Sequence, residues 1–444
     1  MFHDLLRPLF HVAVVAPSVL VPVDVAAGLL AVAALLPAFG RRSRHPVRGL
    51  VVWRLGGVAV GAVIGLVAVW WFGDVQDLYG VSFTPITRMW VALAFGAVGL
   101  LVVTVVQGGW VRRVLGVLAA VAVALAAVLG VNVDFGAYRT IEQAVTTDPY
   151  PSGPLAHETG VGRASSPVVD PATWRAPADM PRRGKVLSVA IPSTVSHFHA
   201  RPADVYLPPA ALTERPPTLP VLISLAGQPG QPSDMFQAGQ LGAVMDAFAE
   251  AHHGLAPIVV APDQLGAPGR NPMCVDSPLG RSATYIMTDT TNWIRQHLRV
   301  GAAPSAWGIV GFSQGATCAM QFSAAHPDVF GTTFAISSEL APLSGSVQHS
   351  IQVGFGGSAS RYAAAAPRAI MRAHGPYPGH LTVFAYGSED DPYVASTTAL
   401  RAAADAAGMQ TRLLVSEGSA HDWNTVRYAL RVGMPGVIAH MGLR

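Results

Sequence analysis

The chain has 444 residues, of which 51 % are apolar and only 12 % are charged, with a formal net charge of +3. This length predicts more than one structural unit. The charged fraction is about half that of an average soluble protein, and no dense basic run indicates nucleic acid as a partner. Two cysteines cannot supply a disulfide-dense scaffold or a four-cysteine zinc site.

Four apolar stretches occupy the first third of the chain. They run from about residue 12 to 39, 50 to 72, 89 to 108 and 114 to 133. Each approaches or exceeds the roughly 20 residues that a helix needs to cross a bilayer. The last two contain no charged residue, whereas a surface helix of a soluble protein would show a polar stripe. Residues 1–137 are therefore predicted to be a transmembrane module of four helices that is retained, not cleaved as a signal peptide.

The loops between these stretches predict an orientation. Arginines at 41, 42, 44 and 48 follow the first stretch, Arg112 and Arg113 follow the third, and Asp74 and Asp77 lie in the second loop. Because positively charged loops stay in the cytoplasm, both termini are expected outside it, in a multi-pass protein of the plasma membrane. Asp24 and Arg54, inside two of the stretches, are interpreted as residues near the membrane interface.

Residues 138–184 carry seven prolines among Gly, Ser, Thr and Asp, with no persistent apolar period. This composition predicts an extracytoplasmic linker, either an extended tether or a wrapping arm. From residue 185 to 444 short apolar runs alternate with helix-like segments. Strands are expected at 186–191, 203–207, 219–225, 256–261, 307–310, 332–337, 381–386 and 411–415, and helices at 234–252, 284–298, 316–325 and 399–407. This alternation predicts an α/β fold with a mostly parallel sheet covered by helices on both faces.

The segment Gly311-Phe312-Ser313-Gln314-Gly315 lies between an expected strand and an expected helix. A Gly-x-Ser-x-Gly sequence in this context has the form of a nucleophile elbow, in which a serine occupies a tight turn. Ser313 is therefore the candidate nucleophile. In this arrangement an acid and then a histidine follow the serine along the chain.

The acid and the histidine are each expected after a later strand. The strand at 381–386 is followed by Glu389, Asp390 and Asp391; Asp390 is the first choice for the acid, Asp391 the second and Glu389 the third. His421 follows the last strand, from which a loop could carry its imidazole to Ser313. His197 and His199 have H-x-H spacing without a further ligand cluster, so no metal site and no cofactor are expected.

An acyl-transfer site also needs donors for an oxyanion. The backbone N–H of Gln314, directly after the nucleophile, is expected to supply one. The second is expected from the loop that follows the strand at 219–225, where Gln228 is the first choice and Gly227 the alternative.

Residues from about 186 to 440 resemble the putative-esterase branch of the α/β-hydrolases, which includes S-formylglutathione hydrolases, feruloyl esterases and actinobacterial mycolyltransferases. The similar segments are 205–208 (VYLP), 259–263 (VVAPD), 311–315 (GFSQG), 326–330 (HPDVF) and 421–423 (HDW). The resemblance implies a serine enzyme that cleaves or transfers an acyl group without a metal. Ala226-Gly227 departs from the His-Gly that many relatives carry there. The resemblance does not cover the four apolar stretches.

Cys274 and Cys318 lie on either side of the expected site. An extracytoplasmic domain allows disulfides to persist, so a Cys274–Cys318 bridge is expected, with two buried free thiols as the alternative.

Together these features predict a membrane-anchored serine esterase that hydrolyses an ester, of a lipid or an envelope glycolipid, at the outer face of the membrane. One alternative is an acyltransferase of mycolyltransferase type, in which a sugar hydroxyl replaces water. Another is a membrane scaffold whose α/β domain binds a ligand without catalysis.

Overall fold

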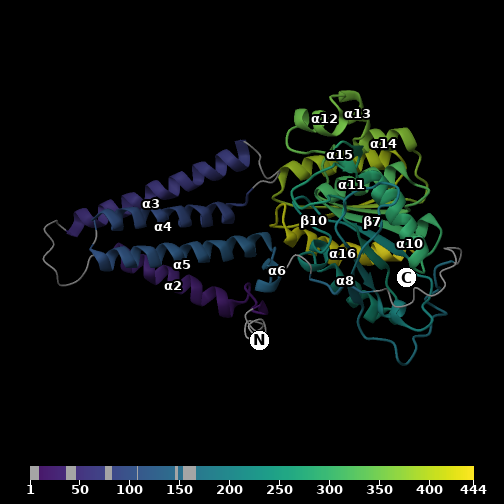
Figure 1. Cartoon of the computed structure of the whole chain (residues 1–444), viewed down its shortest axis with the longest axis horizontal. Coiled ribbons are helices and arrows are strands. Elements are labelled where there is room, and N and C mark those ends of the chain that lie inside the picture. Colours follow the sequence, from purple (N-terminus) through teal and green to yellow (C-terminus); the bar gives the residue numbers. More distant parts are fainter. Residues whose placement is uncertain (1–9, 37–46, 76–82, 108, 146–148, 154–166) are drawn as a thin grey trace. The chain divides into compact units, whose positions relative to one another are not determined.

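The structure, a computed structural model of the whole chain, describes residues 10–36, 47–75, 83–107, 109–145, 149–153 and 167–444. The chain forms two compact units: the first spans Met1–Thr146 and the second spans Thr147–Arg444 (Figure 1). The arginines at 41, 42 and 44, the side chain of Arg48, and Asp77, on which much of the expected orientation depends, lie outside the described residues.

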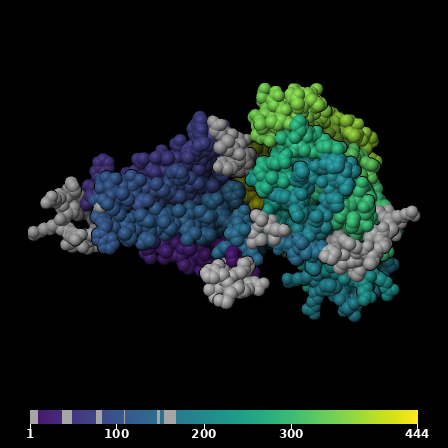
Figure 2. Space-filling model, in the orientation of Figure 1, coloured from purple at the N-terminus to yellow at the C-terminus, as the bar shows by residue number. Residues whose placement is uncertain are grey.

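The first unit contains four long apolar helices that pack against one another (Figure 1); their side chains make up the purple and blue part of the space-filling view (Figure 2). They are α2 (Pro17–Leu35), α3 (Val47–Val69, continued as the π-helix η1, Trp70–Val75), α4 (Pro85–Gln107) and α5 (Trp110–Phe135); the short α6 (Ile141–Val145) follows. All four long helices have the length and composition to cross a membrane. The first begins at Pro17, later than expected, because proline suits the first turn of a helix.

Helices α3 and α4 approach each other closely through glycine. A Cβ atom added to Gly61 would collide with the carbonyl oxygen of Phe95, and one added to Gly99 would collide with that of Gly57. Such contacts between small residues are typical of packed transmembrane helices, where apolar burial gives little driving force. The glycines therefore let the two backbones touch.

Arg54 of α3 is buried in the first unit, with 4 % of its surface exposed. Its Nη1 donates to the carbonyl oxygens of Leu35 (3.0 Å) and Leu36 (3.1 Å), where α2 ends. The last carbonyls of a helix lack partners within the helix and carry partial negative charge. Arg54 thus binds the end of a neighbouring helix, whereas the sequence suggested a side chain that reaches for the membrane interface.

The second unit is built on an eight-stranded sheet with the order β1-β2-β4-β3-β7-β8-β9-β10. Its strands are β1 (Lys185–Val189), β2 (Ala203–Leu207), β3 (Val221–Leu225), β4 (Ile258–Ala261), β7 (Trp307–Phe312), β8 (Thr332–Ile336), β9 (Leu381–Gly387) and β10 (Gln410–Ser416); β5 (Asp276–Ser277) and β6 (Gly280–Arg281) form a separate ribbon. Strand β2 pairs antiparallel with both β1 and β4, and the remaining pairs are parallel. The expected α/β-hydrolase fold is confirmed.

Helices cover both faces of this sheet (Figure 1). The larger core packs the strands against α8 (Leu241–Ala251), α10 (Thr291–His297), α16 (Trp423–His440) and part of α11 (Gln314–Ala325). The other packs α11, α14 (Pro367–His374) and α15 (Asp391–Ala406) around Phe384 of β9. Both apolar faces of the parallel strands are thereby buried, as a parallel sheet requires.

Several helices differ from the expectation. The segment expected as one helix over 234–252 is divided into α7 (Asp234–Gln237) and α8, because Gln240 adopts a left-handed conformation with φ 59°. The helix expected over 284–298 is composite: α9 (Ser282–Thr284), the π-helix η3 (Tyr285–Thr290) and α10. Helices α12 (Val347–Phe355), α13 (Ala359–Ala364), α14 and α16 were not expected.

The described part of the proline-rich segment lies against the second unit. The backbone N–H of Val169 donates to the carbonyl oxygen of Thr218 at 2.9 Å. The indole Nε1 of Trp174 donates to the carbonyl oxygen of His253, also at 2.9 Å, and Val168 and Met180 pack on the core. Residues 167–184 therefore form a wrapping arm, one of the two forms expected for this segment.

Candidate functional site

Ser313 lies at the turn between β7 and α11, the strand and helix expected around it. It has φ 56° and ψ −122°, and 8 % of its surface is exposed. A positive φ is strained for a residue with a side chain and persists only where the surroundings hold it. Here its backbone N–H donates to the carbonyl oxygen of Ile336 at 2.9 Å, and its own carbonyl accepts from the amides of Ala316 and Thr317.

The glycines on either side of Ser313 allow this turn to form. A Cβ atom on Gly311 would collide with the carbonyl group of Gly315. One on Gly315 would collide with the carbonyl oxygens of Leu225 and Ala226, at the end of β3. Helix α11 can therefore begin directly against β3, which places its N-terminus and Ser313 beside the loop that follows that strand.

His421, in the loop after β10, and Asp390, in the loop after β9, contact each other and are both buried. Nδ1 of His421 lies 3.0 Å from Oδ2 of Asp390, and the two side chains are 4 % and 1 % exposed. The same carboxylate oxygen accepts a hydrogen bond from Oγ of Ser337 at 3.3 Å. Asp391 and Glu389, the other two carboxylates considered for this position, are exposed.

Aromatic rings hold the imidazole of His421. The ring stacks against Phe312, the residue before Ser313, with centroids 4.8 Å apart. Tyr393 contacts it from α15, with centroids 4.0 Å apart, and Trp423 packs on Phe312 at 5.2 Å. The stacking on Phe312 brings the imidazole next to the turn that carries Ser313.

The loop after β3 also approaches the nucleophile turn. A Cβ atom placed on Gly227 would lie 3.3 Å from Cβ of Ser313. Within the described residues, the backbone N–H groups of Gln228 and Gln314 have no hydrogen-bond acceptor. Two unpaired amides beside a serine are the groups that an oxyanion site requires.

Cys274 and Cys318 form a disulfide, as expected. Both residues are buried, and the bond joins the loop after β4 to the helix that starts at the nucleophile turn. The alternative of two free thiols is wrong.

Three residues near the candidate site make contacts that the sequence did not predict. Asp422 caps α16 by accepting from the backbone N–H of Thr425 at 2.9 Å, and an Asp-x-x-Thr pattern before a helix is a readable signal for such a cap. Glu339, after β8, accepts from Oγ1 of Thr317 at 3.1 Å; burial raises the pKa of its carboxyl to about 7. Gln264 forms buried contacts, described below, for which the sequence offers no signal.

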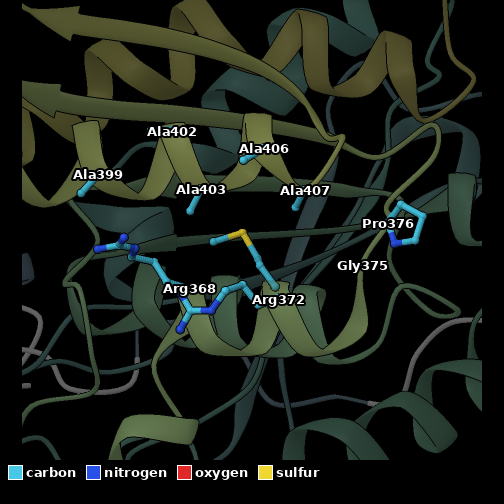
Figure 3. Close-up of a pocket in the computed structure, with 10 residues that line it drawn as sticks. Arg368, Arg372, Gly375, Pro376, Ala399, Ala402, Ala403, Ala406 and Ala407 are labelled. Atoms are coloured by element: carbon cyan, nitrogen blue, oxygen red, sulfur yellow. The ribbon is translucent and has the colours of Figure 1, made fainter.

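A groove on another part of the second unit lies between α14 and α15 and has a volume of about 540 Å³ (Figure 3). Arg368, Met371 and Arg372 of α14 line one side, and alanines of α15, among them Ala403, line the other. None of the candidate site residues lines it.

His197 and His199 are exposed on either side of the buried Phe198, and no group of three or more potential metal ligands occurs in the part of the chain that the structure describes.

Comparisons with known proteins agree with this fold. The family model described as "Putative esterase" matches residues 198–427, just over half of the chain. An uncharacterized protein of Corynebacterium glutamicum is 30 % identical over 320 residues, which make up 71 % of this chain and 73 % of that protein.

Similar solved structures cover the second unit. A ferulic acid esterase is 19 % identical with a TM-score of 0.49, and the match spans 60 % of this chain and 100 % of that one. An S-formylglutathione hydrolase from Agrobacterium tumefaciens is 18 % identical with a TM-score of 0.48, over 60 % of this chain and 98 % of the other. From the match to the family and the relative of 30 % identity, it follows that the chain belongs to the putative-esterase family.

Proposed function

We propose that the chain is a membrane-anchored serine esterase that uses Ser313, His421 and Asp390 as a catalytic triad. The observation that carries this proposal is the buried His421–Asp390 hydrogen bond of 3.0 Å, with the imidazole stacked on Phe312, the neighbour of the strained Ser313. A serine activated by a histidine that a carboxylate orients is the arrangement of covalent acyl-transfer catalysis.

In the proposed reaction, Oγ of Ser313 attacks the ester carbonyl carbon and its proton moves to Nε2 of His421. Asp390 binds Nδ1–H, which fixes the tautomer and stabilises the imidazolium. The backbone N–H groups of Gln314 and of Gln228, or alternatively Gly227, bind the oxyanion of the tetrahedral intermediate. His421 then protonates the leaving alcohol. Water repeats these steps on the acyl-enzyme, which releases the acid and free Ser313.

The proposed substrate is an ester of a lipid or an envelope glycolipid at the outer face of the plasma membrane. The apolar helices α2 to α5 support an anchor in the bilayer. Arg112 and Arg113, in the first turn of α5, support a cytoplasmic side for the connection between α4 and α5, and the Cys274–Cys318 disulfide supports an oxidising compartment. Both features favour an extracytoplasmic second unit.

The test uses intact cells that express the full chain and a fluorophosphonate probe, in a form that crosses membranes and a form that does not. The proposal expects both forms to label the wild type and the Ser360→Ala control, in which an exposed serine of α13 is changed, and neither to label Ser313→Ala. Labelling only by the permeant form would contradict the proposed orientation. Equal labelling of Ser313→Ala would contradict the proposed nucleophile. Hydrolysis of short-chain p-nitrophenyl esters, with and without a sugar acceptor, separates water from a hydroxyl as the acceptor.

A further inference from the structure

Gln264, three residues after β4, connects the two segments that carry the proposed oxyanion donors. Its side-chain Nε2 donates to the carbonyl oxygen of Ala226 at 2.7 Å and to Oε1 of Gln314 at 3.2 Å. Ala226 directly follows β3 and precedes Gly227 and Gln228, whereas Gln314 follows Ser313. One buried amide group, on a residue with 2 % of its surface exposed, therefore ties the two segments together.

The backbone around Gln264 is itself fixed. Oγ of Ser282 donates to the carbonyl oxygen of Gln264 at 2.8 Å. The preceding residue, Asp263, accepts two hydrogen bonds from the guanidinium of Arg201, at 2.8 and 2.9 Å, and Nη2 of Arg201 also donates to the carbonyl oxygen of Gly230. Through Arg201, the segment that carries Gln264 is thus also bound to Gly230, farther along the loop that follows β3.

The side chain of Gln314 is held at both atoms of its amide. Its Oε1 accepts from Gln264, and its Nε2 donates to Oδ1 of Asn271 at 3.1 Å. Nδ2 of Asn271 in turn donates to the carbonyl oxygen of Leu343. Because Gln314 is only 4 % exposed, water cannot readily replace a lost partner, and an unsatisfied buried amide oxygen would force a rearrangement.

Donors that bind an oxyanion act through preorganisation, so their separation and direction must be set before the charge develops. Loss of the Gln264 amide would leave two buried carbonyl-type oxygens, on Ala226 and Gln314, facing each other without a donor between them. We propose that Gln264 is a positioning residue that holds the two oxyanion donors at their working separation without touching the substrate. This inference rests on the proposed esterase function.

A purely structural role for Gln264 would have a different signature. It would lower the stability of the protein and leave the turnover of each folded active site unchanged. A positioning role lowers kcat with little change in KM, because the oxyanion exists only in the transition state and intermediate. It also weakens the binding of a boronic acid, which forms a tetrahedral anion on the serine, more than it weakens the binding of substrate.

The experiment compares the full-length wild type with Gln264→Met, which keeps the side-chain volume and removes the amide. The matched control is Gln321→Met, which removes another buried amide, one that donates to the carbonyl oxygen of Ala365, from α11, the helix that carries Gln314. Active sites are counted by fluorophosphonate titration before kcat, KM and boronate affinity are measured on a p-nitrophenyl ester.

We expect kcat per active site of Gln264→Met to fall by about 10- to 100-fold. This decrease is no larger than the decrease in kcat that removal of one direct oxyanion donor causes. KM should stay within about threefold, boronate affinity should fall with kcat, and Gln321→Met should match the wild type. Equal kcat for Gln264→Met and Gln321→Met would overturn the inference. A wild type that neither hydrolyses esters nor reacts with the fluorophosphonate would instead refute the proposed function.

A second variant keeps the test decisive if Gln264→Met does not fold. Gln264→Asn retains a buried amide but is one methylene shorter, so it cannot reach both Ala226 and Gln314. A lower kcat with unchanged KM in this variant supports the positioning role, and a kcat like that of the wild type overturns it.

Discussion

His421 binds Asp390, and not the neighbouring Asp391, through a 3.0 Å contact between its Nδ1 and Oδ2 of that residue. Asp390 is fully buried after β9, while Asp391 is exposed at the start of α15. Two adjacent carboxylates of the same chemistry therefore occupy different environments, so substitution of each should affect activity differently.

The Asp390→Asn variant should lose most activity while remaining folded. Asparagine keeps the size of the side chain, but its amide cannot hold the imidazole in the tautomer that accepts a proton from serine, and the comparable change in a well-studied triad costs about 10⁴ in kcat. We therefore expect kcat on a p-nitrophenyl ester to fall by about 10³- to 10⁴-fold. The matched control, Asp391→Asn, should stay within about threefold of the wild type, as an exposed substitution normally does. Similar losses in both variants would contradict the assignment of Asp390.

Removal of the Cys274–Cys318 disulfide should destabilise the second unit. The bond closes a loop with a sequence separation of 44, for which the chain-entropy relation gives about 4 kcal/mol. The Cys274→Ser/Cys318→Ser variant should therefore show a clearly lower thermal midpoint in detergent. A reducing agent should lower the midpoint of the wild type and leave the double variant unchanged. A midpoint that neither change affects would contradict a stabilising disulfide.

The stability of the second unit should fall as the pH is lowered below about 6.5, in part because of His380. This side chain is 3 % exposed and lies near His440, and its Nε2 forms a hydrogen bond with Oγ1 of Thr333. Burial and the nearby His440 lower its pKa to about 4. Between pH 6.5 and about 4 the unfolded chain binds a proton that the folded chain does not, so the free energy of unfolding decreases as the pH falls through this window.

The full effect of His380 across that window is roughly 3 kcal/mol, at 1.36 kcal/mol for each pKa unit. The His380→Gln variant removes the titrating group, so its thermal midpoint should depend less steeply on pH between 6.5 and 4.5. Above pH 7 the wild-type histidine is neutral, and the slopes of the two proteins should agree. Identical slopes in the acidic window would show that His380 does not titrate in this way.

Close packing of α3 on α4 predicts that a large side chain at Gly61 is not tolerated. An added Cβ would already collide with the carbonyl oxygen of Phe95, whereas one added to Gly56 of the same helix meets no atom within 4 Å. Gly61→Leu should lower the thermal midpoint of the detergent-solubilised protein, with an overpacking cost of about 1–3 kcal/mol. Gly56→Leu is the matched control and should behave like the wild type. Equal midpoints for the two variants would contradict the packing of α3 and α4.

The elements with strong local signals could be predicted from the sequence. The four apolar helices, the strands of the large sheet and the turn at Ser313 all follow from runs of residues that are contiguous in the chain. The break at Gln240 could not be predicted, because its left-handed conformation interrupts an otherwise helical pattern. Helices α12 to α14 lie in a segment rich in Gly, Ser and Ala and have only nine, six and eight residues, so each offers too few turns for an apolar period to be recognised.

The contacts that assemble the site were the least predictable part. The sequence placed Asp390 and His421 after their strands, but the stacking of Phe312 on His421 depends on the pairing of strands that are distant in the chain. Gln264 shows the limit most clearly: it follows a recognisable strand end, yet its partners Ala226 and Gln314 become neighbours only through the order β4-β3-β7.

If Ser313 is the nucleophile, it should carry the covalent adduct of a fluorophosphonate, and the position of that adduct can be determined. The full chain, solubilised from membranes, is treated with a fluorophosphonate and digested, and the modified peptide is identified by mass spectrometry. The assignment of Ser313 as the nucleophile predicts a single adduct on Ser313, with none in Ser313→Ala and slower formation in Asp390→Asn. An adduct on another serine, or undiminished modification of Ser313→Ala, would contradict it.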